Sequence, residues 1–455
     1  MSKFIKLKKG FNINLAGKAE TKIVDNIHPD TFALKPADFF GIERPKLLVN
    51  EGDTVKAGSP LLLDKKREQV LFTAPVSGEI THIVRGEKRK LLEIRIKADK
   101  EVKHEEFKKY STSEIQSLSK DEAAAQLYKS GAWVNLVERP YGVVANPEVT
   151  PKSIFISAFD TSPLAADYNF VFKGQEQYFQ AGISILKKFT SGTIHLNINA
   201  DAEVAPIFAH AKEVQVNKFS GPHPAGNVGV QIHHIDPIGK GDTVWTIKPF
   251  GVIQIGKLFL EGILDASKVI ALAGSEVSQP QYYKTYVGAC INKFVEGNVK
   301  QDHVRFVSGN PLTGEKIAKD GHVRYFDDVI TVLPEGDHYQ MFGWILPTAN
   351  KLSFHKSFGL FSWLNGSKKE YVLDTNMQGE DRAFVQTGVF EQVTPMDILP
   401  VHLLKAIMAE DYDNMEALGI LEVVEEDLAL CEFVDVSKHP VQEILREGIT
   451  LMQNS

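Results

Sequence analysis

The stretch SIFISAFDTSP, residues 153–163, decides the fold that the sequence predicts for the centre of the chain. Its first part, Ser153–Ala158, is a short apolar run, and a turn follows at Asp160–Pro163. Such a run is typical of a strand buried on both faces of a sheet. An amphipathic helix is expected next, at Lys173–Lys188. This alternation predicts a parallel sheet whose ligands lie at the carboxyl ends of its strands.

The alternation continues along the chain. Strands are expected at Gly192–Asn197, Glu213–Val216, Val244–Ile247 and Val269–Gly274, with a short helix at Ala202–Ala211. Neither a G-x-G-x-x-G fingerprint between a strand and a helix nor a GxxxxGK[ST] loop occurs in the sequence. The sheet therefore carries no sequence motif for nucleotide phosphates.

A second loop at the predicted ligand edge opens the stretch FSGPHPAGNVGVQIHHIDPI, residues 219–238. Glycine and proline constrain its backbone to one shape, which suits a binding loop and equally a structural elbow between two layers. The alternating run after Gly229 predicts a strand, on which His233 and His234 would point to opposite faces, so we expect no metal there. The positions singled out are Ser220, Gly221, Pro222, His223, Pro224, Gly226, His233 and Asp236.

The first hundred residues predict short strands joined by tight turns, at Leu47–Val49, Pro60–Leu63, Val70–Thr73 and Leu91–Ile96. The phrases VNEGDTVKAGSPLL and FTAPVSGEITHI resemble the biotinyl/lipoyl-type barrel sandwich. Carriers of that family present one modifiable lysine on a hairpin. Here Lys65 is followed by Lys66 and Arg67, which match neither carrier pattern, so we expect the barrel without its swinging arm.

Composition limits the function classes. The chain has 455 residues and a net charge of -7, which gives no electrostatic support to wholesale nucleic-acid binding. Its two cysteines, Cys290 and Cys431, exclude a disulfide scaffold and a four-cysteine metal or iron–sulfur site within this chain. We expect neither a secretory signal nor a membrane span, and hence a protein that is cytosolic or peripheral to a membrane.

The remaining segments predict three further features. A helix centred on Ala123–Leu127 should stop at Gly131, and the aromatic and basic residues Trp133, Arg139 and Tyr141 after it suit either a ring-binding site or the core. A hairpin is expected from Tyr339–Trp344 and Lys351–His355. The last sixty residues predict helices that start near prolines. Their acidic residues suit a solvated face or a docking surface for a basic partner.

Five segments in order resemble one family, the A subunits of the sodium-translocating NADH:quinone oxidoreductase. They are KLKKGFNINLAG, DKKREQVLFTAPVSGEI, SAFDTSPLAADYNF, the stretch 219–238 and EEDLALCEFV. The resemblance covers essentially the whole chain, and it extends to the C subunit of the Rnf complex and the FMN subunit of complex I. It implies an α/β multidomain chain. Its parts are a barrel-sandwich domain at 1–100, a Rossmann-like domain without its nucleotide motif at 101–280, a small ubiquitin-like or SLBB-type α+β domain at 281–390 and a helical domain at 391–455.

The same resemblance implies a function. The complex would oxidise NADH, pass electrons through FMN, FAD, riboflavin and iron–sulfur centres in partner subunits, reduce ubiquinone or menaquinone and export sodium. This chain would be a peripheral subunit on the cytoplasmic side of the bacterial inner membrane, next to the membrane-embedded B subunit. Isolated, it would be soluble and inactive.

Departures from the relatives bear on cofactors. Complex I's FMN subunit carries a glycine-rich flavin loop where this chain has Asp160-Thr161-Ser162-Pro163-Leu164, and an acid near a phosphate disfavours its binding. Cys431 has no second cysteine four residues further on, because position 435 is occupied by Asp435. A single thiolate cannot hold an iron–sulfur cluster. We therefore expect no redox cofactor, no metal and no catalytic side chain in this chain.

A quinone site needs an apolar slot, ring contacts and donors for the carbonyl oxygens. Residues with that chemistry are Trp133, Arg139, Tyr141, Phe159 and His223. Three alternatives stay open at this point: a pure assembly scaffold without a quinone contact, a biotinyl/lipoyl-type carrier and a self-sufficient flavin dehydrogenase.

Overall fold

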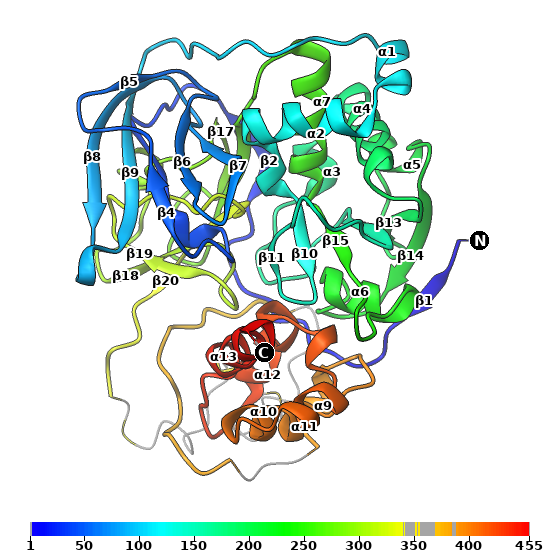
Figure 1. The fold of residues 1–455 in the computed structure, drawn as a ribbon. Coiled ribbons are helices and arrows are strands. Elements are labelled where there is room, and N and C mark those ends of the chain that lie inside the picture. The colour runs from blue at the N-terminus through cyan, green and yellow to red at the C-terminus, as the bar shows by residue number, and fades with distance from the viewer. Residues whose placement is uncertain are drawn as a thin grey trace.

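The N-terminal barrel sandwich is built from two small sheets. The computed structural model describes residues 2–339, 341, 351–352, 354, 369–384 and 388–454. One sheet has the order β3-β9-β8-β5 and the other β4-β6-β7 (Figure 1). Leu61, Ile80, Ile94 and Ile96 fill the space between them without exposed surface. The strands are β3 (Thr31–Leu34), β4 (Pro45–Leu47), β5 (Thr54–Val55), β6 (Pro60–Asp64), β7 (Arg67–Thr73), β8 (Gly78–Arg85) and β9 (Leu91–Ala98).

The predicted parallel sheet forms the second domain. Its order is β1-β14-β13-β12-β15-β10-β11, with parallel pairing from β1 to β15 and antiparallel pairing of β10 with β15 and β11. SIFIS, at its centre, is fully buried over Ile154–Ile156, as its apolar run predicts. The strands are β1 (Phe4–Lys6), β10 (Val137–Arg139), β11 (Val143–Val144), β12 (Ser153–Ser157), β13 (Thr193–Asn199), β14 (Gln215–Ser220) and β15 (Val244–Thr246).

Helices cover this sheet. The helix α2 ends at Gly131, whose φ of 82° is the left-handed conformation that glycine allows. Helices α4 and α7 pack so closely that glycines stand at the contact. The helices are α1 (Thr112–Ser117), α2 (Lys120–Ser130), α3 (Tyr168–Val171), α4 (Glu176–Leu186), α5 (Pro206–Ala209), α6 (Val228–Ile235) and α7 (Pro249–Glu261).

The prediction of a strand after Gly229 is wrong, because residues 228–235 form helix α6. The chain has to return from β14 to β15 in parallel orientation, and such a crossover is made by a helix. His233 and His234 therefore lie next to each other near the end of α6, with ring centroids 5.1 Å apart, and do not point to opposite faces of a strand.

The strand predicted at Val269–Gly274 forms, but it does not belong to the parallel sheet. It is β16 (Ser267–Ala273), in a mixed third sheet of order β19-β18-β20-β16-β17-β2. The apolar run is the same in either sheet, so the sequence pattern did not show which sheet the strand would join. The other strands are β2 (Glu20–Val24), β17 (Gln281–Tyr286), β18 (Val304–Ser308), β19 (Glu315–Ile317) and β20 (Val329–Pro334), with helix α8 (Asn292–Val295) beside them.

The chain ends in a helical domain that lies below the sheets in Figure 1. Its helices are α9 (Phe390–Val393), α10 (Pro400–Met408), α11 (Tyr412–Ala417), α12 (Glu425–Val434) and α13 (Val441–Asn454). Prolines stand at or directly before the first residue of α10 and α13, as predicted. Most of the hairpin expected at 339–344 and 351–355 lies outside the described residues. Across the described ranges, no helix has the length and apolar character needed to cross a bilayer.

Replacement of Gly256 by alanine should strongly destabilise the second domain. A Cβ at Gly256 in α7 would stand 1.8 Å from the carbonyl oxygen of Tyr178 in α4, so the two helices would have to move apart. We expect the free energy of unfolding to fall by about 3 kcal/mol. Urea unfolding followed by circular dichroism measures it. The exposed Gly239, whose nearest atom would be 3.5 Å away, is the matched control and should tolerate alanine.

Candidate functional site

All four parts of the chain line one large cavity, of about 600 Å³. It lies at the carboxyl ends of β12 and β15 and beside the loop after β14, where ligands of such sheets bind. The barrel, the third domain and the helical domain close its other sides. Among its lining residues are Asp38, Phe40, Arg139, Ser157, Phe159, Asp160, Ser162, Tyr168, His223, Gly226, Lys248, Phe250, Lys268, Leu312, Arg324, Phe326, Asp328, Val424, Glu426, Gln442 and Arg446.

A buried charged cluster forms one wall. The Asp328 carboxylate lies 2.9 Å from Lys268 Nζ and 3.4 Å from Lys248 Nζ, and Tyr168 donates its hydroxyl to Asp328 over 2.9 Å. Burial opposes the charge on Asp328, but the two ammonium groups hold the pKa of that carboxyl well below its usual value. Burial lowers the pKa of Lys268. The side chain of Lys248 is 48% exposed, which leaves its ammonium available as a donor to a ligand.

An ion-paired contact between β10 and α12 forms another part of the lining. Arg139 Nη2 lies 2.9 Å from Glu426 Oε1, and Arg139 Nη1 lies 3.4 Å from Asp427 Oδ2. Burial, with the neighbouring Asp427, raises the pKa of Glu426 to about 7, and burial also raises the pKa of Asp427. The Asp427 carboxylate lies against Gly229 in the first turn of α6, where a Cβ would come within 2.2 Å of it. The positive end of the α6 dipole favours a carboxylate there.

The loop of residues 219–229 is fixed from two sides. The backbone of His223 accepts a hydrogen bond from Phe11 N and donates one to Asn12 Oδ1, so the N-terminal segment holds it. Thr161, in the loop after β12, accepts from Gly226 N and lies 3.1 Å from His223 Nδ1. Burial lowers the pKa of His223 to about 4, so its ring is neutral at neutral pH.

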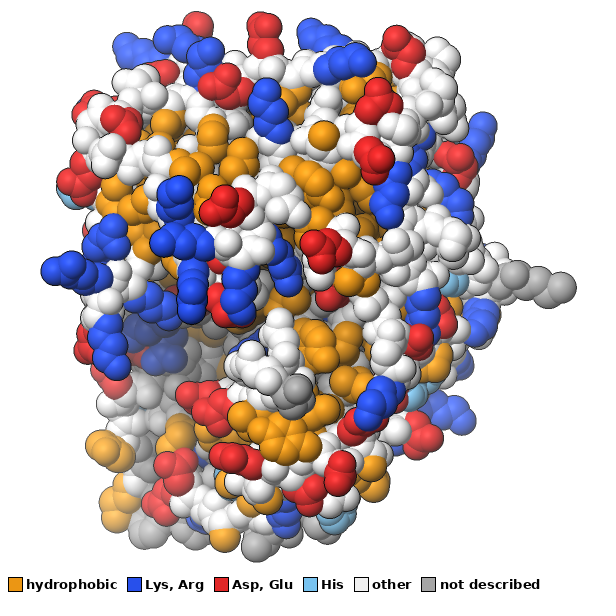
Figure 2. Space-filling view, viewed as in Figure 1, with side chains coloured by type: hydrophobic (Ala, Val, Ile, Leu, Met, Phe, Trp, Pro, Cys, Tyr) orange, Lys and Arg blue, Asp and Glu red, His pale blue; other side chains and the backbone are white. Residues whose placement is uncertain are grey.

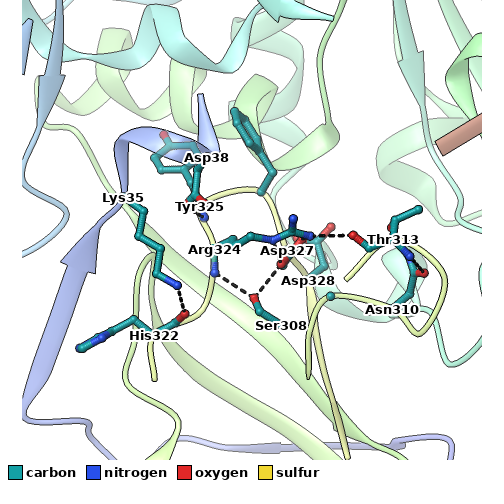
Figure 3. Close-up of polar contacts among 12 residues, drawn as sticks. Lys35, Asp38, Ser308, Asn310, Thr313, His322, Arg324, Tyr325, Asp327 and Asp328 are labelled. Carbon is teal, nitrogen blue, oxygen red and sulfur yellow. Dashed lines mark hydrogen bonds and ion pairs between the residues drawn. The ribbon is translucent and has the colours of Figure 1, made fainter. Parts of the chain in front are cut away.

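A polar joint connects the barrel to the third domain at the edge of the cavity (Figure 3). Tyr325 N donates to Asp38 over 2.8 Å, and burial raises the pKa of Asp38 to about 7. Arg324 pairs with Asp327 at 2.7 Å, and the Ser308 hydroxyl links the Arg324 backbone to the same carboxylate. This joint places Asp38, Arg324 and Asp327 on one stretch of the lining.

The structure brings together three of the five residues with quinone-binding chemistry. Arg139, Phe159 and His223 line the cavity. Trp133 lies in the core of the second domain instead, 1% exposed and packed edge-on against Trp245. The backbone carbonyl of Tyr141 accepts a hydrogen bond from Arg446, and its ring packs at the edge of the core.

The positions singled out in the stretch 219–238 separate into two groups. His223 and Gly226 line the cavity. Ser220 donates to Asp201, and Gly221 and Pro222 pack against the N-terminal segment, while the carbonyl of Pro224 accepts from Asn227 N. His233 lies 2.6 Å from Glu422, and Asp236 accepts from Ser153 at the amino end of β12, away from the cavity.

Sequence reasoning missed Lys248, Lys268, Asp328 and Glu426. Lys248 had a usable signal, since it directly follows the strand run 244–247 and precedes the helix-starting Pro249. The other three come from the third and fourth domains, and no local pattern indicates that their side chains meet those of the second.

The loop after β12, where the resemblance placed the flavin loop of complex I's FMN subunit, contains Asp160 in this chain. Asp160 Oδ1 accepts the Ser162 backbone N–H over 2.7 Å, so a carboxylate occupies a donor that a phosphate would use. The residues present therefore do not fit a flavin phosphate at this loop. Across the ranges given above, no group of three or more His, Cys, Asp or Glu is placed to hold a metal ion.

Replacement of Arg139 by methionine should destabilise the chain in a pH-dependent manner. Above pH 7 the variant leaves Asp427 buried and unpaired, a loss of about 3–5 kcal/mol. As the pH falls through 7, Glu426, whose pKa burial raises to about 7, takes up a proton and the loss should begin to shrink. Burial also raises the pKa of Asp427, so its protonation should reduce the loss further. Thermal unfolding on both sides of pH 7 measures it.

Two further variants sharpen that test. Arg44→Met changes an exposed arginine and should have little effect. R139M/D427N should recover most of the lost stability, since it removes the unpaired charge. A loss that is the same at every pH would contradict this account.

Comparisons with known proteins agree with the architecture. Three family models match: the NqrA N-terminal barrel-sandwich hybrid domain over residues 5–99, the NqrA second alpha/beta domain over 118–264 and the NQRA C-terminal domain over 269–319. They correspond to the barrel, the parallel-sheet domain and the start of the third domain.

Full-length relatives give the same result. The chain is 37% identical over 452 residues to the A subunit of the Na(+)-translocating NADH-quinone reductase from Alcanivorax borkumensis, covering 99% of both chains. It is 40% identical over 447 residues to the A subunit of the Haemophilus influenzae enzyme of the same name, covering 97% of this chain and 98% of the relative.

Among solved structures, an NAD+-reducing [NiFe]-hydrogenase in the air-oxidised state matches 51% of this chain and 52% of its own at a TM-score of 0.34 and 12% identity. The identity over nearly the full length of the named relatives confirms the resemblance noted in the sequence. The chain belongs to the family of the A subunits of Na(+)-translocating NADH-quinone reductase.

Proposed function

We propose that this chain is a peripheral, cofactor-free subunit of a sodium-pumping NADH:quinone oxidoreductase and that its four-domain cavity receives the quinone headgroup. The observation that carries the proposal is that Arg139, Phe159 and His223 line the same cavity as the half-exposed Lys248. A quinone presents a flat ring and two carbonyl oxygens, and these residues offer ring contacts and hydrogen-bond donors.

The cavity has the shape and chemistry that a headgroup needs. Phe40, Phe159, Phe250 and Phe326 supply apolar and aromatic surface. Lys248 already donates to the Phe326 carbonyl over 2.8 Å, so its ammonium is held at the cavity wall. Reduction to the quinol takes up two electrons and two protons. The electrons would come from NADH through flavins and iron–sulfur centres in partner subunits. This chain would hold no flavin itself, because the loop at Asp160 offers no phosphate cradle.

The location within the complex is part of the same proposal. The chain would lie on the cytoplasmic side of the inner membrane against the membrane-embedded B subunit, and isolated it would be inactive. A pure scaffold is the main alternative, since the cavity wall at Arg139 and Asp427 also holds the domains together. Experiments on the assembled complex can distinguish a quinone-binding subunit from a pure scaffold.

Removal of a ring contact or of a hydrogen-bond donor in the cavity should raise the KM of the complex for quinone. In complexes that carry Phe159→Ala or Lys248→Gln, we expect KM for quinone to rise about tenfold while NADH oxidation by an artificial acceptor is unchanged. A quinone with a photoreactive tail should label this chain, and both variants should reduce the labelling. Phe4→Ala and Lys218→Gln, at exposed positions far from the cavity, are the matched controls. Unchanged KM with no labelling of this chain would favour the scaffold.

The purified chain should be unmodified and colourless. A biotinyl or lipoyl carrier would show added mass on Lys65, and a flavin dehydrogenase would be yellow and oxidise NADH alone. We expect the intact mass of the bare sequence, no visible absorbance and no NADH oxidation. An added mass that disappears in Lys65→Arg would contradict the proposal that the barrel hairpin is not a carrier. A bound flavin would contradict the proposal that the loop at Asp160 does not fit a flavin phosphate.

A further inference from the structure

The barrel carries unpaired cations on two neighbouring turns. Arg44, Lys46 and Lys65 are exposed around the β6–β7 turn, where Lys65 N donates to the Arg44 carbonyl and holds the two side chains on one edge. Within the described part of the chain, no ion pair involves any of these three residues. The nearby Glu43 is already paired with Lys66 at 2.6 Å.

The second group lies on the β8–β9 turn. Arg85, Lys88, Arg89 and Lys90 are exposed there, and Lys88 and Arg89 adopt positive φ in a tight projecting turn. None of the four forms an ion pair with a residue that the structure describes. Glu87 is the acid within this turn. We call the two groups together the basic rim.

A surface hollow lies beside Arg85, and its lining starts at Leu47, the residue directly after Lys46. Residues 47–51, from the last residue of β4 onward, line it together with Ile83 and Arg85 of β8. Leu48 and Leu92 are 40% and 39% exposed at this rim, and Leu92 packs on Gly86 of the projecting turn. Figure 2 shows Lys and Arg side chains gathered over the left of the molecule, with apolar surface between them, where Figure 1 places the barrel strands. Cations interleaved with exposed leucines are typical of surfaces that bind membranes.

Positive charge is concentrated in the barrel domain and negative charge in the C-terminal helical domain. Residues 1–100 contain 20 Lys/Arg and 13 Asp/Glu, whereas residues 391–455 contain 3 Lys/Arg and 14 Asp/Glu. An anionic surface would repel the helical end and attract the barrel, so the molecule would approach such a surface in one orientation.

We propose that the basic rim binds the anionic phospholipid headgroups of the membrane in which the sodium-pumping complex lies. Ion translocation requires a bilayer, and the described part of this chain has no helix that crosses one. Flexible lysines on two turns suit many mobile headgroups better than a single fixed carboxylate of a protein partner. The inference is independent of the quinone proposal, because the rim lies on the barrel and shares no residue with the cavity.

The test is binding of the full chain to lipid vesicles. Vesicles of phosphatidylcholine with about a third phosphatidylglycerol should bind it at low salt, and vesicles of phosphatidylcholine alone should not. The variant K46E/K65E/K88E/K90E should lower binding by more than about tenfold. The control K129E/K173E/K212E/K218E makes the same charge change at exposed lysines of the second domain and should bind nearly as well as the parent.

Thermal unfolding of both variants verifies that they are folded. The proposal would be overturned by no binding of the parent to anionic vesicles, by equal binding to neutral vesicles, by equal loss in the rim variant and the control, or by undiminished binding of the rim variant. A rim variant that binds vesicles normally but no longer assembles with the other subunits would assign the rim to a protein partner instead.

Discussion

The buried ion pair between Arg139 and Asp427 is the contact on which the arrangement around the cavity depends. It joins the end of β10 to the first turn of α12, and the exposed fractions of the two side chains are only 4% and 0%. A buried charge is tolerated only when it is paired, so the helical domain is fixed over the ligand edge of the parallel sheet. Gly229 allows the carboxylate to approach the start of α6, where the helix dipole adds to its stabilisation.

The N-terminal segment is a second constraint on the same region. Before the barrel begins, β1 pairs with β14 of the parallel sheet and β2 pairs with β17 of the third sheet. Between these strands, Phe11 and Asn12 hold His223 through backbone and amide hydrogen bonds. The glycine- and proline-rich loop is therefore an elbow held by the N-terminus and, at His223 and Gly226, part of the cavity wall.

The chemistry of the cavity follows from which domains contribute to it. The parallel sheet supplies Phe159, Lys248 and the Asp160 loop, and the third domain supplies Asp328, which holds Lys248 and Lys268 in place. Most of the charges are satisfied by each other, and Lys248 keeps a donor for a ligand. The carboxylate of Asp160 already accepts the Ser162 backbone N–H that a phosphate at this loop would use.

The sequence by itself determined several local elements: the barrel strands β6, β7 and β9, the buried strand at Ser153–Ser157, the stop of α2 at Gly131 and the proline-led helices α10 and α13. These depend on short-range effects, namely apolar periodicity and the conformational limits of glycine and proline. It also singled out Arg139, Phe159 and His223 as candidates for quinone binding, and these three line the cavity, whereas Trp133, chosen on the same chemical grounds, lies in the core.

Only the tertiary structure decided that 228–235 is a helix, that Ser267–Ala273 joins the third sheet and that Lys268, Asp328 and Glu426 meet at one cavity. A crossover between parallel strands, the choice of sheet and contacts between residues hundreds of positions apart are set by packing of whole domains. The same local sequence is compatible with more than one such arrangement, and long-range contacts select among them.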